Sequence, residues 1–89
     1  ADFLCEFKGR EQDGAYLVKI KNKVLLNDEI EIITPTEQFK TQITKITNDS
    51  GEELPLGNTN DDVWITFSES PKDYKYAIAR TIGVKSHVS

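Results

Sequence analysis

The sequence is poor in the residues that build disulfides and metal sites, with one cysteine and one histidine among 89 residues. Because a lone cysteine cannot close an intrachain disulfide, stability must come from packing, and a reducing cytoplasm is the expected location. Cys5 and His87 stand at opposite ends of the chain, whereas a zinc site needs several such ligands together. We therefore expect no metal and no cofactor, a buried structural Cys5 and a solvated His87.

Long apolar runs are also absent. No stretch approaches the roughly 18 residues of a membrane span and no charged-then-apolar leader opens the chain, so we expect neither a membrane protein nor a secreted one. The formal net charge of −4 argues against a domain that binds nucleic acid by itself, because phosphate neutralisation needs a basic surplus. The chain has no methionine and opens inside an apparent strand, so we expect a piece of a longer protein.

A catalytic constellation is lacking as well. The chain has no glycine-rich phosphate loop and no serine flanked by glycines in a strained turn. Adjacent residues on a strand point to opposite faces, so the neighbouring carboxylates do not form an acid–base pair; they are Asp28 with Glu29, Glu52 with Glu53, and Asp61 with Asp62. We predict that the chain contains no catalytic residue.

What the sequence does contain is apolar and polar residues that alternate with a period of two. The stretch from Tyr16 to Pro35 predicts two strands joined by a short apolar connection. Residues 9–14 form a turn signal that ends in Asp13-Gly14, Pro35 ends a strand, and residues 48–51 form a second turn. The expected strands lie at residues 2–8, 15–22, 29–34, 39–47, 52–56, 63–67 and 74–81, followed by a frayed tail at 83–89.

Short strands at near-regular spacing, with no segment of 3.6-residue period, predict one all-β domain over residues 1–89. A small closed or nearly closed antiparallel β-barrel is favoured over a sandwich because the strands are few and Ile46 is out of phase with Ile43, which indicates a bulge near Thr44 and Lys45. The apolar residues 24–26 either plug one end of the barrel or lengthen a strand. The predicted core comprises Val18, Ile20, Ile30, Ile32, Phe39, Ile43, Val63, Ile65 and Phe67.

A basic stripe is the first candidate binding surface. Lys19, Lys21 and Lys23 repeat with a period of two opposite Val18 and Ile20, and Lys40 and Lys45 on a neighbouring strand would widen the stripe. The lysines either form a solvated outer face or contact RNA phosphate or an acidic partner.

An aromatic group is the second candidate binding surface. Trp64 takes the outward phase of a well-patterned strand, and Tyr74 and Tyr76 follow in the next one. The three rings either form an exposed patch of the kind that interfaces favour or build a second small core.

Short motifs along the predicted strands carry a family resemblance. They are Asn22-Lys23, Asn27-Asp28-Glu29-Ile30-Glu31-Ile32, Thr34-Pro35, a strand that begins at Phe39, Gly51-Glu52, and Arg80. From about Phe3 to Arg80 the chain resembles the C-terminal domain of peptidase family U32, the collagenase-like peptidases, whose members include proteins implicated in hydroxylating tRNA. Asn27 stands where that family usually has glycine, a substitution that fits a position with positive φ because asparagine tolerates it. Val24 replaces the usual aromatic residue, and Cys5 replaces a glycine.

The resemblance implies an accessory barrel, similar to the barrel domains of translation factors, attached after a separate catalytic domain that carries the peptidase motif. We expect it to position a macromolecular substrate, either protein or tRNA, for that catalytic domain. The rival expectation is a purely structural or oligomerisation module that docks on the parent protein. In isolation we expect a monomer.

Overall fold

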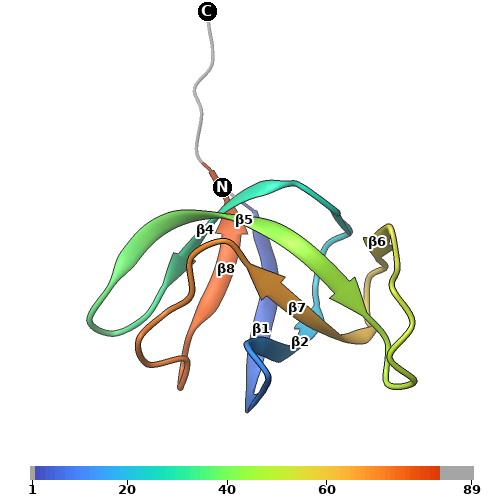
Figure 1. Ribbon diagram of the computed structural model, residues 1–89. Coiled ribbons are helices and arrows are strands. Elements are labelled where there is room, and N and C mark those ends of the chain that lie inside the picture. The colour runs from blue at the N-terminus through green and yellow to red at the C-terminus, as the bar shows by residue number, and fades with distance from the viewer. Residues whose placement is uncertain (1, 83–89) are drawn as a thin grey trace, which may run out of the picture.

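The computed structural model describes residues 2–82, and its strands are all antiparallel. The elements are β1 (Phe3–Gln12), β2 (Ala15–Ile20), β3 (Val24–Leu25), β4 (Glu29–Ile33), β5 (Gln38–Thr47), β6 (Leu56–Gly57), β7 (Asp62–Phe67) and β8 (Ile78–Thr81). Six strands close on themselves in the order β1-β2-β7-β5-β4-β8, while β3 and β6 form a separate pair (Figure 1). The predicted all-β, closed or nearly closed antiparallel fold is confirmed, and no helix occurs within residues 2–82.

The β1–β2 hairpin turns through two residues. Gln12 pairs with Ala15, and the intervening Asp13 and Gly14 have φ values of 54° and 84°, as a tight turn of the primed type requires. The predicted turn at residues 9–14 begins too early, because Gly9 lies inside β1. With a φ of +80°, Gly9 sits where the β1–β2 register shifts between Phe7 and Glu11, so the first glycine makes a bulge rather than a turn.

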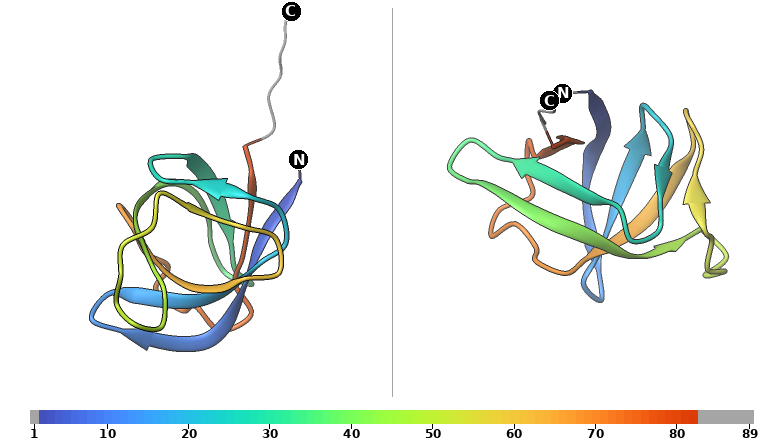
Figure 2. Two further views of the ribbon diagram at one scale, coloured as in Figure 1. Left: turned by 90° about the vertical axis from the view of Figure 1, so that its right-hand side faces the viewer. Right: turned by 90° about the horizontal axis from the view of Figure 1, so that it is seen from above.

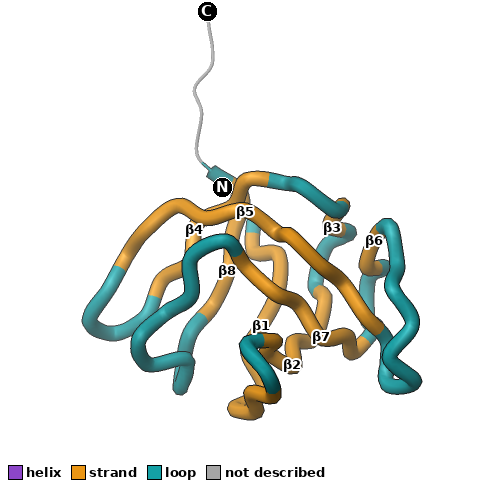
Figure 3. Tube along the Cα trace, in the orientation of Figure 1, coloured by secondary structure: helices purple, strands orange, loops and turns teal. Residues whose placement is uncertain are grey.

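β5 is one bent strand that belongs to two neighbours. Its first half pairs with β4 and its second half with β7, and the tube drawing shows it crossing the front of the molecule (Figure 3). The register shifts between Ile43 and Lys45, which confirms the predicted bulge. The extra residue returns Ile46 to the interior, so that both Ile43 and Ile46 are completely buried.

The core fills the inside of the closed sheet. Every predicted core residue except Phe39 is buried, and Phe39 is partly buried against the same cluster. Leu4 and Cys5 are both buried although they are adjacent, because the β1–β8 register shifts between Phe3 and Cys5. An aromatic cluster fills one end of the barrel, with ring centroids 5.2–6.1 Å apart along the contacts of Tyr16 with Phe7, Phe67 and Tyr74.

The opposite end is closed by the connection between β2 and β4. Val24 is fully buried and pairs with Gly57, whereas Leu25 is 45% and Leu26 is 38% exposed. Of the apolar residues 24–26, only Val24 plugs the end of the barrel. The two turned views of the ribbon show how the closed sheet surrounds the interior (Figure 2).

Four predicted strands differ in extent from the observed ones. β1 continues to Gln12 instead of ending at Lys8, and β2 ends at Ile20 instead of Asn22. Residues 52–56 contribute only an isolated bridge between Thr47 and Glu53 before the two-residue β6, because Pro55 interrupts the ladder. The last strand begins at Ile78 rather than Tyr74, and Tyr76, with a φ of 64°, lies in a turn before it. Because of this turn, Ala77 and Ala79 face the core, and the alternation of buried and exposed residues is shifted by one from the pattern expected for a strand over 74–81. The predicted tail at 83–89, including His87, lies outside the described residues.

Candidate functional site

A hollow on the outer wall of the barrel surrounds Trp64. Its volume is about 290 Å³, and its walls come from the β1–β2 hairpin, the bent half of β5 and the turn after β5. Gln12, Asp13, Lys45 and Asp49 supply polar groups around the indole. Sequence reasoning singled out Trp64 but missed these neighbours, because they meet only once the pairing of β7 with both β2 and β5 is known.

Strand register sets the position of the indole. Trp64 lies on the outward phase of β7, opposite Leu17 of β2 and Thr47 of β5. Its Nε1–H points at Asp49 Oδ1, with a nitrogen–oxygen distance of 3.4 Å. The ring is therefore partly exposed and is held from one side by the turn that carries Asp49.

That turn is built by its own side chains. Asn48 Oδ1 accepts hydrogen bonds from the backbone N–H groups of Ser50 and Glu52, both at 3.0 Å. Gly51, one of the family-motif residues, has a φ of +83°, a conformation that glycine adopts without strain. The motif glycine thus shapes the wall of the hollow.

The lysines do not form one basic stripe along a strand, because β2 ends at Ile20 and Lys21 lies in the following bend. Lys19 stands between Glu6 and Asp62 on the neighbouring strands, and its Nζ is 4.0 Å from an Asp62 oxygen. Lys23 shares a surface hollow with Asp28 and Glu29. Acidic neighbours therefore offset much of the positive charge.

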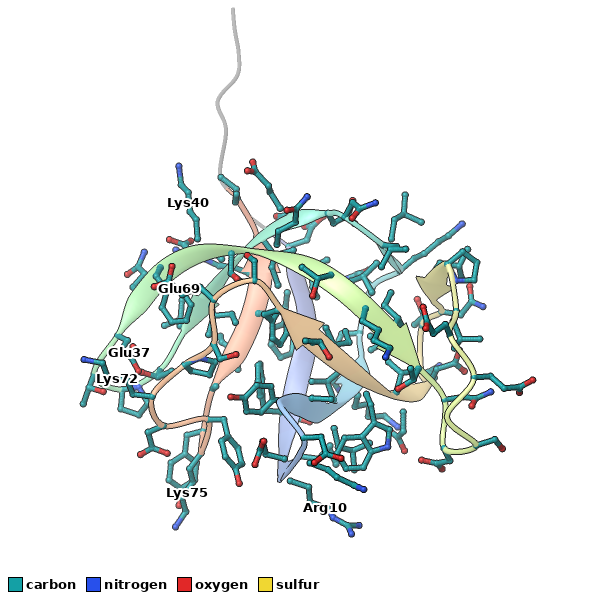
Figure 4. All side chains as sticks on the ribbon, viewed as in Figure 1. Arg10, Glu37, Lys40, Glu69, Lys72 and Lys75 are labelled. Atoms are coloured by element: carbon teal, nitrogen blue, oxygen red, sulfur yellow. The ribbon has the colours of Figure 1, made fainter. Side chains whose placement is uncertain are left out.

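The other predicted lysines are also dispersed. Lys45 lines the Trp64 hollow, and its Nζ lies 3.9 Å from a Glu53 oxygen. Lys40 is the cross-strand neighbour of Glu31. In Figure 4, Lys40 projects from the top of the molecule, whereas the labelled Lys75 and Arg10 project from its lower edge.

The aromatic residues are not gathered around Trp64. Tyr74 is partly buried, with its ring 5.2 Å from that of Tyr16 at the end of the core. Tyr76 is 76% exposed beside Lys75 and lines a different hollow, together with Lys8 and Gly9. The predicted aromatic group thus separates into a core ring, an isolated exposed ring and the indole of the hollow.

The motif around Asn22 and Asn27 holds the plug in place. Asn22 Nδ2 donates to the Phe3 carbonyl at 2.6 Å. Asn27 has a φ of 75°, which confirms the conformation expected at a position where glycine is usual, and its N–H donates to the Ile43 carbonyl. Asp28 Oδ2 accepts from the Leu25 N–H at 2.9 Å, while Glu29 opens β4 with an exposed side chain.

The remaining motif residues fix the other side of the barrel. Thr34 Oγ1 accepts from the N–H groups of Thr36 and Glu37, which orders the turn through Pro35. Arg80 Nε donates to Glu31 Oε1 at 2.9 Å across the β4–β8 pair. A hydrogen bond from Gln38 and the contact with Arg80 lower the pKa of the Glu31 carboxyl.

Cys5 is completely buried, and desolvation raises the pKa of its thiol to about 12. It therefore stays a neutral thiol packed in the core, as expected for a structural cysteine. Within residues 2–82 no three His, Cys, Asp or Glu side chains gather as metal ligands. The same part of the chain has no helix long and apolar enough to cross a membrane.

The structure thus defines a small antiparallel β-domain with a closed sheet and a tryptophan-lined hollow on its wall. Residues 1–80 match the family described as the peptidase family U32 C-terminal domain, and the chain belongs to that family.

Solved structures show the same fold. The C-terminal domain of a Geobacillus thermoleovorans protein described as a U32 peptidase superposes with a TM-score of 0.77 at 24% identity, over 92% of this chain and 93% of that chain. Its selenomethionine variant gives the same TM-score and identity, over 91% of this chain and 100% of that chain. None of the curated proteins matches this chain.

Proposed function

We propose that this chain is a non-catalytic accessory domain that holds a polypeptide segment of the substrate for the catalytic domain of a U32 family protein. The observation that carries the proposal is the partly exposed indole of Trp64 in a hollow of about 290 Å³. The family supplies the context, because a C-terminal domain works beside the rest of its parent protein.

The hollow offers what a polypeptide segment needs. The indole is a large, rigid apolar surface of the type that dominates binding energy at protein interfaces. Lys45 and Gln12 can donate hydrogen bonds to backbone carbonyls, and Asp13 can accept them from backbone N–H groups. An apolar side chain of the substrate would lie on the ring while these groups hold its backbone.

Charge favours polypeptide over RNA. Phosphate binding requires a basic surface, yet Lys19 lies between Glu6 and Asp62 and the net charge is −4. Lys45, the cation of the hollow, already lies 3.9 Å from a Glu53 oxygen. The hollow therefore presents charges of both signs, which suit a neutral peptide backbone better than a polyanion.

Intrinsic fluorescence gives a direct test, because Trp64 is the only tryptophan. Titrating the protein with carboxymethylated unfolded casein is expected to shift the emission of Trp64 saturably. Calorimetry of Trp64→Ala should show binding weakened by about 2 kcal/mol or more, which corresponds to a roughly 30-fold higher Kd. Tyr76→Ala removes an exposed ring from a different hollow and is the matched control, expected to bind as the wild type does. Unchanged emission at saturating casein would refute the proposal.

The same samples test the tRNA alternative. If Lys19, Lys21 and Lys23 contact phosphates, tRNA binding should weaken steeply with salt and fall in the triple Lys→Ala variant. Binding of tRNA with that pattern, together with no response to casein, would replace the polypeptide proposal. Monomeric behaviour of the isolated domain and a cytoplasmic location remain predictions.

A further inference from the structure

Two leucines that follow one another in the chain are exposed at the plugged end of the barrel. Leu25 is 45% and Leu26 is 38% exposed. Leu25 pairs with Leu56 of β6, and the Leu26 N–H donates to the Pro55 carbonyl at 3.0 Å. We call Leu25, Leu26, Pro55 and Leu56 the β3–β6 ridge. Exposed apolar residues on and beside a strand pair make the ridge a candidate interaction surface.

The ridge is held rigidly. Fully buried Val24 anchors its start, and Asp28 Oδ2 accepts the Leu25 N–H at 2.9 Å. On the following turn, the Asn27 N–H donates to the Ile43 carbonyl at 2.8 Å. The two leucines therefore cannot turn inward to escape water, and the ridge is preorganised for a partner.

The ridge also lies near the point where the parent chain enters the domain. The Leu4 carbonyl accepts from the N–H groups of Lys21 and Asn22, at 2.7 and 3.2 Å, and Asn22 Nδ2 donates to the Phe3 carbonyl. The start of β1 is thus bonded to the bend that leads directly into β3. In a C-terminal domain the preceding part of the parent arrives through β1.

We infer that the β3–β6 ridge packs against the domain that precedes this one in the parent chain. Its apolar chemistry fits a packed domain interface, and its connection to the start of β1 identifies that neighbour as the occupant. The inference goes beyond the proposed function and does not depend on it. The Trp64 hollow and the ridge share no residue, so the two surfaces can be tested separately.

Hydroxyl-radical footprinting tests the inference without any substitution. Oxidation of Leu25 and Leu26 is compared between the 89-residue chain and the full natural chain, with Tyr76 as the internal control because it is 76% exposed on a different surface. Docking predicts that both leucines are oxidised several-fold more slowly in the full chain while Tyr76 is unchanged. Equal leucine rates in the two chains would overturn the inference. Leucine protection in the 89-residue chain that grows with its concentration would assign the ridge to a second copy instead.

A pair of variants of the full chain supplies the second measurement. Leu25→Ser with Leu26→Ser should release the domain and enlarge the radius of gyration in solution scattering, whereas Tyr76→Ser should not. Both positions are exposed, so the barrel core is retained. An unchanged radius of gyration in the double variant would show that the ridge does not hold the two domains together, contrary to the inference.

Discussion

Gly57 pairs with Val24 of the plug, and replacing it by alanine would perturb the packing between the plug and the barrel. A methyl group at Gly57 would lie 3.2 Å from both Cδ1 and Cγ1 of Ile20 and 3.3 Å from Cγ2 of Val24. Ile20 and Val24 are both completely buried, so neither can move aside into solvent. The added methyl group must therefore strain the plug.

The expected loss follows from two opposing effects. Overpacking a dense core costs about 1–3 kcal/mol, and replacing glycine by alanine recovers about 0.4–1 kcal/mol by restricting the unfolded chain. The net prediction is a free energy of unfolding lower by up to about 2.6 kcal/mol, with about 1.3 kcal/mol at the middle of the range. Ile20→Val removes one of the atoms that the methyl group meets, so the double variant should lose less than the sum of the single losses.

Urea unfolding followed by Trp64 fluorescence and circular dichroism measures these free energies. Ile32→Val is the matched control, because Ile32 is equally buried but is not among the atoms nearest to Gly57. Its effect should add to that of Gly57→Ala. If Gly57→Ala makes the protein more stable, or if Ile20→Val and Gly57→Ala are strictly additive, the described plug packing is wrong.

Three further predictions follow from single side chains. Burial raises the pKa of the Cys5 thiol to about 12, so disulfide reagents at pH 8 should modify it only as fast as the protein unfolds, and rapid labelling of the native state would contradict this. The folded protein lowers the pKa of the Glu31 carboxyl from 4.5, so the ionised carboxylate stabilises the fold above pH 4.5, and this stabilisation is lost as the pH falls through the lowered value. The difference in free energy of unfolding between wild type and Glu31→Gln should therefore shrink on acidification, whereas the difference for the control Glu29→Gln should not. Asn27→Ala, at a φ of 75°, should lower the free energy of unfolding by about 1 kcal/mol, whereas Asn27→Gly should not.

Local patterns predicted most of the barrel. Alternation located β2, β4 and β7, and the phase slip at Ile46 located the bulge, because one buried face imposes a strict period of two. The errors in strand extent lie where backbone conformation, rather than side-chain polarity, decides which residues face the core. Gly9 became a bulge and Tyr76 a turn with positive φ, and neither outcome leaves an alternating signature.

The candidate site was less predictable because it depends on strand order. Period two placed Trp64 outside, but the neighbours of the indole come from β1, β5 and two turns that are distant in sequence. The same lack of strand order made the lysines look like a stripe, since Glu6 and Asp62 flank Lys19 only after β1 and β7 have paired with β2.

The most direct test of the proposed function is the nuclear magnetic resonance signal of the single indole N–H group. In a labelled sample of this chain, unfolded casein is expected to shift the Trp64 indole resonance together with the backbone amides of Asp13, Lys45 and Asp49, which border the hollow. Amides near Tyr76, which lines a different hollow, should not shift. A Trp64 indole resonance that stays in place while casein shifts amides elsewhere, or shifts none, would contradict the assignment of this hollow as the polypeptide-binding site.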